Sequence, residues 1–224
     1  AQKRSVPKLA PKTLKSWYKK HNVNNSISPQ GRNDKSNVIS SKNIISTEME
    51  KSKPLKTVYL FCDEFTNYND VPIGIKAIEL LLHLGYAVEL IQHPESGRAH
   101  ISKGLLDTAQ QLAQRNVDTF AGLISEETPL IGIEPSAILS FRDEYPRLVA
   151  KKDQERAKTL AKNALLIDEF LAQEVELGNI DSKQFTKEKQ HILLHGHCHQ
   201  KALSSVSHTA WLLSLPENYT VEVI

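Results

Sequence analysis

Cysteine is scarce in this sequence, with two in 224 residues, and long apolar runs are absent. Two cysteines are too few for a disulfide framework, so free thiols are expected. The sequence has no stretch of about 18 apolar residues, which is the length needed to cross a membrane. The N-terminus also lacks the apolar block of a secretion signal. These absences favour a cytoplasmic protein, either free or peripheral to the inner face of the membrane.

Acidic residues are rare in the first quarter of the chain. Residues 1–56 hold 13 Lys/Arg against 3 Asp/Glu, although the net charge of the whole chain is only +2. A basic arm can bind nucleic acid, but this one has a single aromatic pair, Trp17 and Tyr18, and no nucleic-acid motif. No nucleic-acid partner is therefore expected. Leu14, Trp17 and Tyr18 have the spacing of a short docking helix, and residues 22–53 have the composition of a linker.

From residue 55 onward, apolar runs rich in β-formers alternate with segments of helical spacing. The predicted strands are 57–62, 86–91, 129–134, 191–195 and 219–224. The predicted helices are 75–85, 102–114, 117–123, 135–141, 153–177 and 201–215. This alternation predicts an α/β fold with a mostly parallel sheet and flanking helices.

The chain divides into a basic arm and linker over residues 1–54, a first α/β half over 55–150 and a second over 151–224. The second half begins with the long helix predicted over residues 153–177. The first residue is Ala1, and the last, Ile224, lies within a run of strand character. Both ends are interpreted as cuts in a longer polypeptide, so the second half is expected to be truncated at its C-terminus.

An internal repeat connects the two halves. The strand–helix–strand pattern of residues 59–91 recurs over residues 194–224. Cys62 follows the first strand of one copy and Cys198 follows that of the other, so the two cysteines are expected at equivalent positions in the fold. Open α/β sheets bind ligands at the carboxyl ends of their strands. The two thiols are therefore predicted to face one shared cleft.

Residues 195–200 (HGHCHQ) combine three imidazoles and one thiol. Thiolate suits iron–sulfur clusters or zinc, and imidazole suits zinc or iron. Alternation along an extended backbone directs His195 and His197 to one side and Cys198 to the other, so at most two or three of these donors converge. The alternative is that the histidines cap the strand and the helix while Cys198 is a small buried hydrophobe. The spacing leaves both interpretations open.

Three motifs in order carry a family resemblance: residues 97–105 (GRAHISKGL), 133–145 (IEPSAILSFRDEY) and 195–203 (HGHCHQKAL). They resemble the cysteine-rich C-terminal domain of FAD-linked oxidase and iron–sulfur oxidoreductases, which is of the Cys-Cys-Gly type and is related to heterodisulfide reductase subunits. That family includes D-lactate, glycolate and D-2-hydroxyglutarate dehydrogenase-like flavoproteins.

The resemblance implies a parent enzyme that oxidises a small 2-hydroxy acid. FAD and ferredoxin-like domains with 4Fe-4S clusters would lie elsewhere in the same polypeptide. This part would serve electron transfer or cluster binding near the substrate site. FAD is not expected to bind here, because the chain has no dinucleotide-binding glycine fingerprint.

The sequence departs from the family pattern in its first half. Residues 95–97 read Glu-Ser-Gly where the family has Cys-Cys-Gly, and Ala137 stands where a further cysteine often follows. A cluster is therefore expected to be absent or incomplete in this chain. Zinc bound by the 195–199 motif is one alternative, and a non-catalytic docking domain with degraded cluster sites is another.

The remaining candidates are polar residues beside predicted helix starts. Arg98, Ser102 and Lys103 lie at a loop-to-helix junction, where an anion would be favoured; alternatively, Ser102 caps the helix and the bases are solvated. Glu134 and Arg142 are predicted to form an ion pair. No catalytic residue is assigned. The candidate metal ligands are Cys62, His195, His197, Cys198 and His199, and the candidate substrate or anion residues are Arg98, Ser102, Lys103, Glu134 and Arg142.

Overall fold

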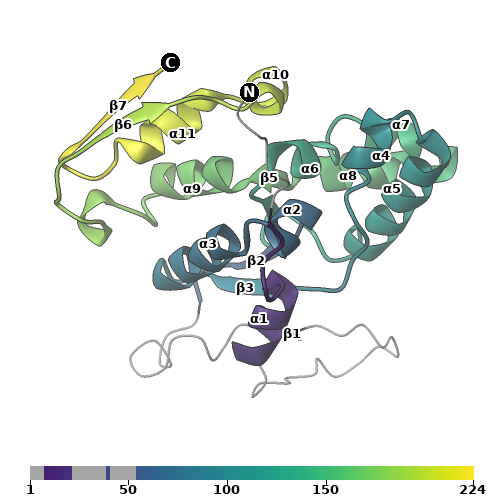
Figure 1. Cartoon of the computed structure of the whole chain (residues 1–224), viewed down its shortest axis with the longest axis horizontal. Coiled ribbons are helices and arrows are strands. Elements are labelled where there is room, and N and C mark those ends of the chain that lie inside the picture. Colours follow the sequence, from purple (N-terminus) through teal and green to yellow (C-terminus); the bar gives the residue numbers. More distant parts are fainter. Residues whose placement is uncertain (1–7, 22–38, 41–53) are drawn as a thin grey trace.

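The computed structural model describes residues 8–21, 39–40 and 54–224. Apart from Ile39 and Ser40, the linker predicted over residues 22–53 lies outside the described residues. A sheet with helices around it occupies the middle of the molecule, and a smaller two-stranded sheet near the C-terminus lies at one side (Figure 1).

The larger sheet has five strands in the order β1-β3-β2-β4-β5. Strand β1 is antiparallel to β3, and the other neighbours are parallel. The strands are β1 Ile39–Ser40, β2 Thr57–Phe61, β3 Ala87–Leu90, β4 Leu130–Gly132 and β5 Ala164–Leu166. From β2 the chain passes to β3 on one side and then crosses to β4 on the other. The point where the winding reverses therefore lies between β2 and β4.

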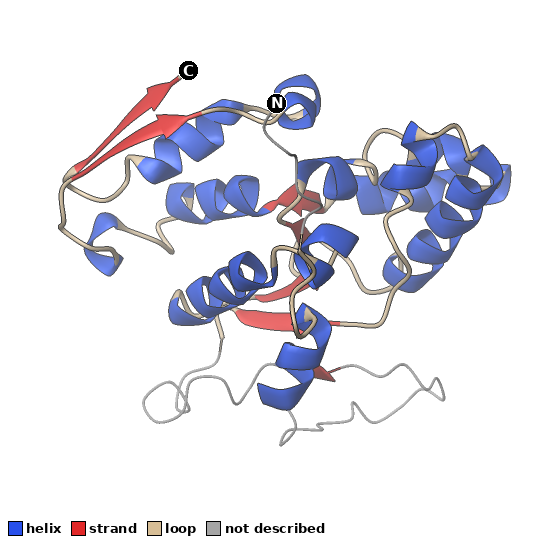
Figure 2. Cartoon of the chain, in the orientation of Figure 1, coloured by secondary structure: helices blue, strands red, loops and turns tan. Residues whose placement is uncertain are grey.

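Helices cover this sheet and connect its strands (Figure 2). In chain order they are α1 Leu14–His21, α2 Glu64–Tyr68, α3 Val71–His83, α4 Arg98–Ser102, α5 Leu106–Phe120, α6 Pro135–Leu139, α7 Tyr145–Leu148, α8 Gln154–Lys162, α9 Ile167–Glu176, α10 Cys198–Leu203 and α11 Val206–Leu213. Short 3-10 turns occur at Lys151–Asp153 and Ser182–Gln184.

The smaller sheet pairs β6 Gln190–Leu194 in parallel with β7 Tyr219–Val223. Helix α11 contacts both β7 and α9, and α10 contacts α6. We call residues 57–90 the first repeat and residues 190–223 the second repeat, because each is a parallel strand–helix–strand unit. The second repeat therefore packs against the larger sheet through α9 and α6.

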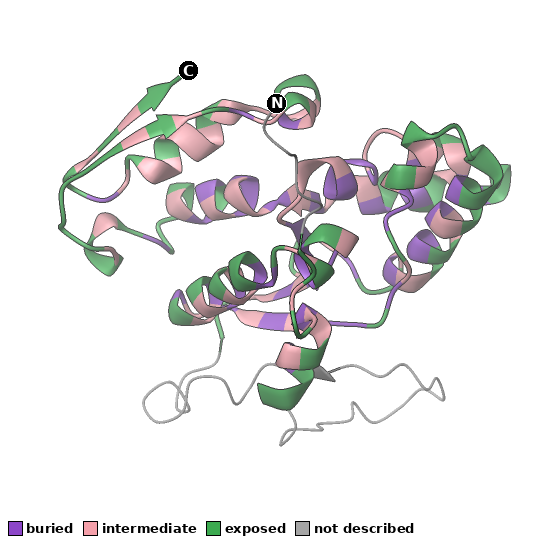
Figure 3. Cartoon of the chain, viewed as in Figure 1, coloured by how far each residue is buried: buried purple, intermediate pink, exposed green. Residues whose placement is uncertain are grey.

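Buried residues lie on the larger sheet and on the helices around it (Figure 3), and they form two apolar clusters. Val58 and Leu60 point into one apolar cluster together with Cys62, whereas Phe61 points into the other. Successive residues of a strand face opposite sides, and the apolar run at residues 58–61 of β2 suits a strand that is covered on both faces. The predicted α/β fold with a mostly parallel sheet is confirmed.

The helix predicted from Leu14 and Tyr18 is confirmed as α1, and both side chains are fully buried. Helix α1 contacts α2 and α3, so it docks on the first repeat.

The single long helix predicted over residues 153–177 is wrong. The chain forms α8, then β5, then α9, because residues 164–166 pair with β4 at the edge of the larger sheet. Ala and Leu are strong helix formers, but burial in a sheet overrides their local preference. A signal was present in the sequence: Asp168 and Glu169 follow directly, and acidic residues favour the first turn of a new helix.

The predicted helix over 201–215 is also divided, since α10 ends before Ser204 and Ser205 caps α11 through its hydroxyl. The helix predicted from Ser102 begins at Leu106 instead and continues to Phe120, so the separate helix over 117–123 is mostly the end of α5. Gly104 separates α4 from α5 with a left-handed φ of 72°, a conformation that glycine adopts without strain.

Candidate functional site

The carboxyl ends of β2 and β4 lie side by side where the winding of the sheet reverses. Ligands of open α/β sheets bind at this position. Asp63 follows the end of β2, and Glu134 follows the end of β4. Both side chains cap the helix that comes next, so the site has two fixed carboxylates at its base.

Asp63 is almost fully buried and accepts hydrogen bonds from the backbone N–H groups of Phe65 and Thr66, at 2.8 and 2.9 Å, and from the Thr66 hydroxyl, at 2.5 Å. Burial raises the pKa of Asp63 to about 6; the hydrogen bonds from Thr66 oppose this, and the nearby charges of Glu134 and Glu64 add to it. A carboxyl in this environment holds its proton more firmly than an exposed one.

Helix α10 of the second repeat brings three donors together. Potential ligand atoms of His197, Cys198 and His199 all lie within 4.8 Å of one another. The Cys198 thiol is exposed, and its Sγ lies 3.8 Å from Nδ1 of His199. Gly196 allows this turn because a Cβ there would lie 2.4 Å from Cγ2 of Val206.

His197 is held by contacts on both sides of its ring. Its Nδ1 accepts a hydrogen bond from the backbone N–H of His199 at 3.2 Å and so caps α10. Because Nδ1 accepts, the ring proton is on Nε2, and Nε2 lies 3.8 Å from Oε1 of Glu134. Oε2 of Glu134 accepts the N–H of Ala137 at 2.6 Å. The site is therefore composite, with a carboxylate from the larger sheet and imidazoles from the second repeat.

His195 does not belong to this group. It is exposed, and it directly follows β6, whereas Cys198 lies four residues past the strand. Cys62 directly follows β2, so the residue at the equivalent position of the second repeat is His195 and not Cys198. The equivalence predicted for the two cysteines is wrong, because Cys62 precedes the capping residue of its helix and Cys198 follows it.

Cys62 is 2% exposed and belongs to an apolar cluster. Its thiol donates to Oδ1 of Asn67 at 3.6 Å, and its backbone N–H donates to Nε2 of His93 at 3.2 Å. Burial raises the pKa of the Cys62 thiol to about 12, against the opposing charge of Lys15. A buried thiol of this kind is inert. The prediction that both cysteines face one open cleft is therefore wrong.

His93 is also occupied. Its Nε2 accepts from Cys62, so its Nδ1 carries the proton and donates to the carbonyl oxygen of Pro94 at 2.7 Å. Burial lowers the pKa of His93 to about 3. The ring stays neutral and stacks on Phe61, with 4.4 Å between ring centroids.

The turn at residues 95–97 is built from hydrogen bonds. Ser96 is fully buried, and its N–H and hydroxyl donate to the Glu64 carboxylate at 3.1 and 2.6 Å. The Tyr145 hydroxyl donates to the Ser96 carbonyl oxygen at 2.8 Å. Gly97 has a φ of 75°, which favours glycine. The turn is thus held by a contact between Ser96 and the Glu64 carboxylate and by a glycine with a left-handed φ.

The basic candidates of the first half lie outside the Cys198 group. Arg98 forms an ion pair with Glu144, Ser102 is the last residue of α4, and Lys103 is exposed in the turn that follows. Ser102 therefore does not cap a helix start. The Arg98 guanidinium already has a carboxylate partner.

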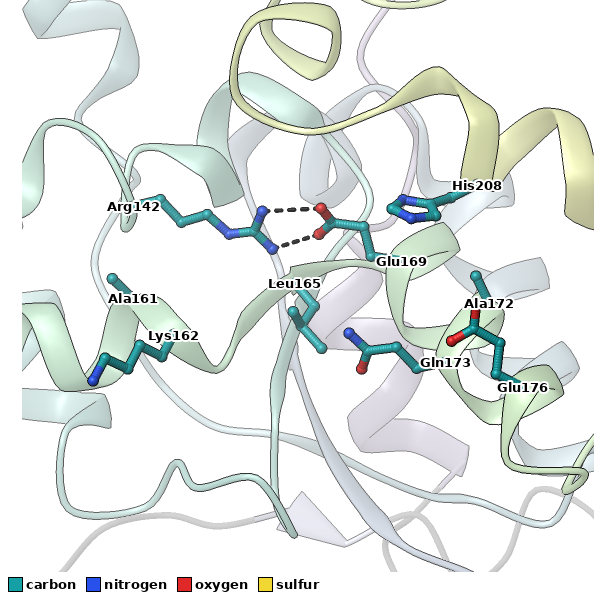
Figure 4. Close-up of a pocket in the computed structure, with 9 residues that line it drawn as sticks. All are labelled: Arg142, Ala161, Lys162, Leu165, Glu169, Ala172, Gln173, Glu176 and His208. Carbon is teal, nitrogen blue, oxygen red and sulfur yellow. Dashed lines mark hydrogen bonds and ion pairs between the residues drawn. The ribbon is translucent and has the colours of Figure 1, made fainter.

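The predicted ion pair between Glu134 and Arg142 is wrong. Arg142 instead makes a two-point contact with Glu169, with Nη1 at 2.9 Å from Oε1 (Figure 4). Its Nε donates to the Ala164 carbonyl oxygen at 2.7 Å. The Ser204 hydroxyl also donates to Glu169. Arg142 therefore faces α9 and the second repeat rather than the strand ends.

A second polar contact joins α9 to the second repeat, and sequence reasoning missed it. The amide of Gln200, which is buried, donates to Asp168 at 2.7 Å and to Thr209 at 2.8 Å. The Thr209 hydroxyl also donates to Asp168. Asp63 was missed as well, although a carboxylate directly after a buried strand and three residues before Thr66 is a typical capping pattern.

None of the described helices is long and apolar enough to cross a membrane.

The fold and the site define an α/β chain with a Cys/His group and two carboxylates at the reversal point of its larger sheet. The chain is similar to proteins named D-2-hydroxyglutarate dehydrogenase. It is 29% identical to that of Escherichia coli over 121 residues, covering 54% of this chain and 11% of that protein. It is 25% identical to that of Pantoea ananatis over 128 residues, covering 57% of this chain and 12% of that protein.

A further relative, the D-2-hydroxyglutarate dehydrogenase of Pseudomonas putida, is 28% identical over 101 residues, which is 45% of this chain and 10% of that protein. The chain spans about a tenth of the length of the curated relatives it matches. No family model and no solved structure matches the chain. Similarity to 2-hydroxy acid dehydrogenases is therefore supported over about half of the chain.

Proposed function

We propose that this chain is a segment of an FAD-linked 2-hydroxy acid dehydrogenase in which the site at the sheet reversal serves electron transfer or metal binding near the substrate. The observation that supports this proposal is the grouping of Cys198 with two histidines, one of which faces Glu134 at the end of β4, in a chain similar to D-2-hydroxyglutarate dehydrogenases. FAD would be held by other segments of the protein.

The described residues do not by themselves fit a four-iron cluster. Such a cluster is held by four thiolates, and the described residues offer one accessible thiol, Cys198, because Cys62 is buried in an apolar cluster. A cluster at this site would need thiolates from outside these residues.

A zinc site is the second candidate, and the grouping of His197, Cys198 and His199 supports it. Zinc takes thiolate and imidazole ligands in tetrahedral geometry. His197 offers no free nitrogen in its present orientation, because Nδ1 caps α10 and Nε2 carries the proton that faces Glu134. Metal binding through His197 would therefore require loss of the cap, either to free Nδ1 for the metal or to let Nδ1 carry the ring proton so that Nε2 becomes available.

A non-catalytic docking domain is the third candidate. The contact between Ser96 and Glu64 supports it, because it fills the first-half turn with ordinary hydrogen bonds. This candidate predicts no bound metal, whereas the two others predict iron or zinc.

The decisive experiment uses the natural gene product that contains these 224 residues, purified without oxygen. D-2-hydroxyglutarate, D-lactate and glycolate are added separately, and flavin reduction, dye reduction and metal content are measured. The proposal expects at least one acid to reduce a bound flavin. It also expects Cys198→Ser to slow steady-state dye reduction while flavin reduction by the acid in a single turnover is unchanged.

His191→Ala is the matched control, because His191 is an exposed histidine of β6 outside the Cys198 group. It should leave both rates unchanged. Absence of flavin, or a flavin that no 2-hydroxy acid reduces, contradicts the proposal. Zinc that is lost in Cys198→Ser, with no iron, favours the second candidate, and no metal in either protein favours the third.

A further inference from the structure

Helix α1 is packed into the first repeat by two side chains on one face. Leu14 and Tyr18 are fully buried, and the Tyr18 hydroxyl donates to the Val88 carbonyl oxygen at 2.6 Å. Gly74 of α3 leaves the space that Leu14 occupies, because a Cβ on Gly74 would lie 2.4 Å from Cδ2 of Leu14. The first repeat therefore has a groove whose shape matches this helix.

Helix α1 also reaches the residues that surround Cys62. The backbone N–H of Lys15 donates to Oδ1 of Asn67 at 3.1 Å, and this same oxygen accepts from the Cys62 thiol at 3.6 Å. The Lys15 ammonium donates to the carbonyl oxygen of His93 at 3.5 Å, and the His93 ring accepts from the Cys62 backbone N–H. The helix thus closes over Cys62 through both of its polar neighbours.

The attachment of α1 is weaker than that of the strands beneath it. The helix has eight residues, and isolated helices of that length are marginal in water. Docking also removes water from the Lys15 ammonium, and this burial lowers the pKa of Lys15, against the opposing charges of Glu64 and Asp63. Cys62 itself follows β2, which has parallel neighbours on both sides. Local opening therefore starts at α1 before the sheet separates.

We propose that α1 is a detachable cover over Cys62, so that undocking of α1, with the larger sheet intact, makes this thiol accessible to solvent. The proposal goes beyond the proposed function, because it concerns the first repeat and not the Cys198 group. It assigns to α1 a role in controlling access to a buried thiol.

The first test measures alkylation of the two cysteines by iodoacetamide in the whole chain, with each site quantified by mass spectrometry of its peptide. Cys198, which is exposed, serves as the internal reference. The rate for Cys62 is followed at increasing urea below the unfolding transition. Because the denaturant slope scales with the surface exposed, undocking of α1 predicts a slope well below that of global unfolding. A slope equal to the global one overturns the proposal.

The second test compares Leu14→Ser with Leu9→Ser, because Leu14 is fully buried in the groove whereas Leu9 is 72% exposed. Leu14→Ser should raise the Cys62 alkylation rate at least tenfold, with the Cys198 rate unchanged, and Leu9→Ser should change neither rate. Equal Cys62 rates in the two variants contradict the proposal. If Leu14→Ser does not fold, the urea slope of the unaltered chain decides the question alone.

Discussion

Strand β2 of the first repeat lies between two parallel neighbours, whereas β6 of the second repeat has one. Leu60 of β2 is 1% exposed and Leu193 of β6 is 59% exposed, although both are the fourth residue of their strand. The same supersecondary unit is thus a buried core in one place and a surface layer in the other. The comparison shows that burial depends on the strands and helices packed around the repeat, and not on the repeat itself.

The two cysteines differ in burial in the same way as the two strands, and their chemistry differs accordingly. Cys62 lies in an apolar cluster beside β2, and Cys198 lies on the exposed first turn of α10. Burial favours an inert thiol, and exposure beside imidazoles favours a reactive or ligating one. The candidate site therefore belongs to the second repeat, while the larger sheet contributes its carboxylates.

The largest effect should come from shortening equivalent leucines. We expect Leu60→Ala to lower the free energy of unfolding by about 2–5 kcal/mol, because it leaves a cavity in a packed core. Leu193→Ala should change it by less than about 0.5 kcal/mol, as at other surface positions. Urea denaturation of both variants measures the contrast. Equal losses would mean that β6 is buried as deeply as β2.

Removing the partner of Glu169 should destabilise the fold where α9 packs on the larger sheet. We expect Arg142→Ala to cost about 3 kcal/mol, since it leaves a largely buried carboxylate without its ion pair. Arg147→Ala, which breaks the more exposed contact with Asp143, should cost less than about 1 kcal/mol. Urea denaturation at pH 7 tests this, and similar costs for the two variants would contradict it.

The same pair predicts a pH dependence. Burial alone would raise the pKa of Glu169, but hydrogen bonds from Arg142 and Ser204 outweigh it and hold the pKa below its ordinary value. A lowered carboxyl pKa stabilises the fold above the unfolded value of about 4.3, and this contribution is lost as the pH falls through the folded pKa. The gap in stability between the unaltered chain and Arg142→Ala should therefore narrow below about pH 4.

Asp63 should make the stability of the fold depend on pH in the opposite direction. Its pKa is raised to about 6 by burial, so it favours folding at low pH, and this contribution is lost as the pH rises through the folded value. We expect Asp63→Asn to gain about 2–3 kcal/mol relative to the unaltered chain between pH 4 and pH 7. Asn still supplies an oxygen for the helix cap. Asp181→Asn, at the exposed cap of a 3-10 turn, is the control. A plot of its free energy of unfolding against pH should run parallel to that of the unaltered chain.

The smallest effect concerns the cap of α10. We expect His197→Ala to cost about 1 kcal/mol, because the N–H of His199 loses its acceptor. His197→Asn should restore most of this loss, since Asn is a favourable capping residue. Thermal unfolding with both variants measures it. An Asn variant no better than Ala would mean that His197 does not act as a cap.

Much of the fold was predictable because its signals are local. The β-forming run at residues 57–61, the helical spacing of α3 and the pair Glu134–Pro135 each specify their element within a few residues. The grouping of His197, Cys198 and His199 was not predictable in this way, because alternation along an extended backbone would direct His197 and Cys198 to opposite sides, and the turn into α10 brings them together. The strand at residues 164–166 was not predictable from local signals. Ala and Leu also form helices, and only pairing with a neighbouring strand selects the strand here.

The sequence alone determined the alternation of strands and helices, the internal repeat and the donors at residues 197–199, because periodicity and spacing are written along the chain. Only the tertiary structure decided that Cys62 is buried, that Arg142 pairs with Glu169 and that Glu134 faces His197. These facts depend on which distant segments pack together. Burial and ion pairing are properties of that packing, and no local pattern encodes them.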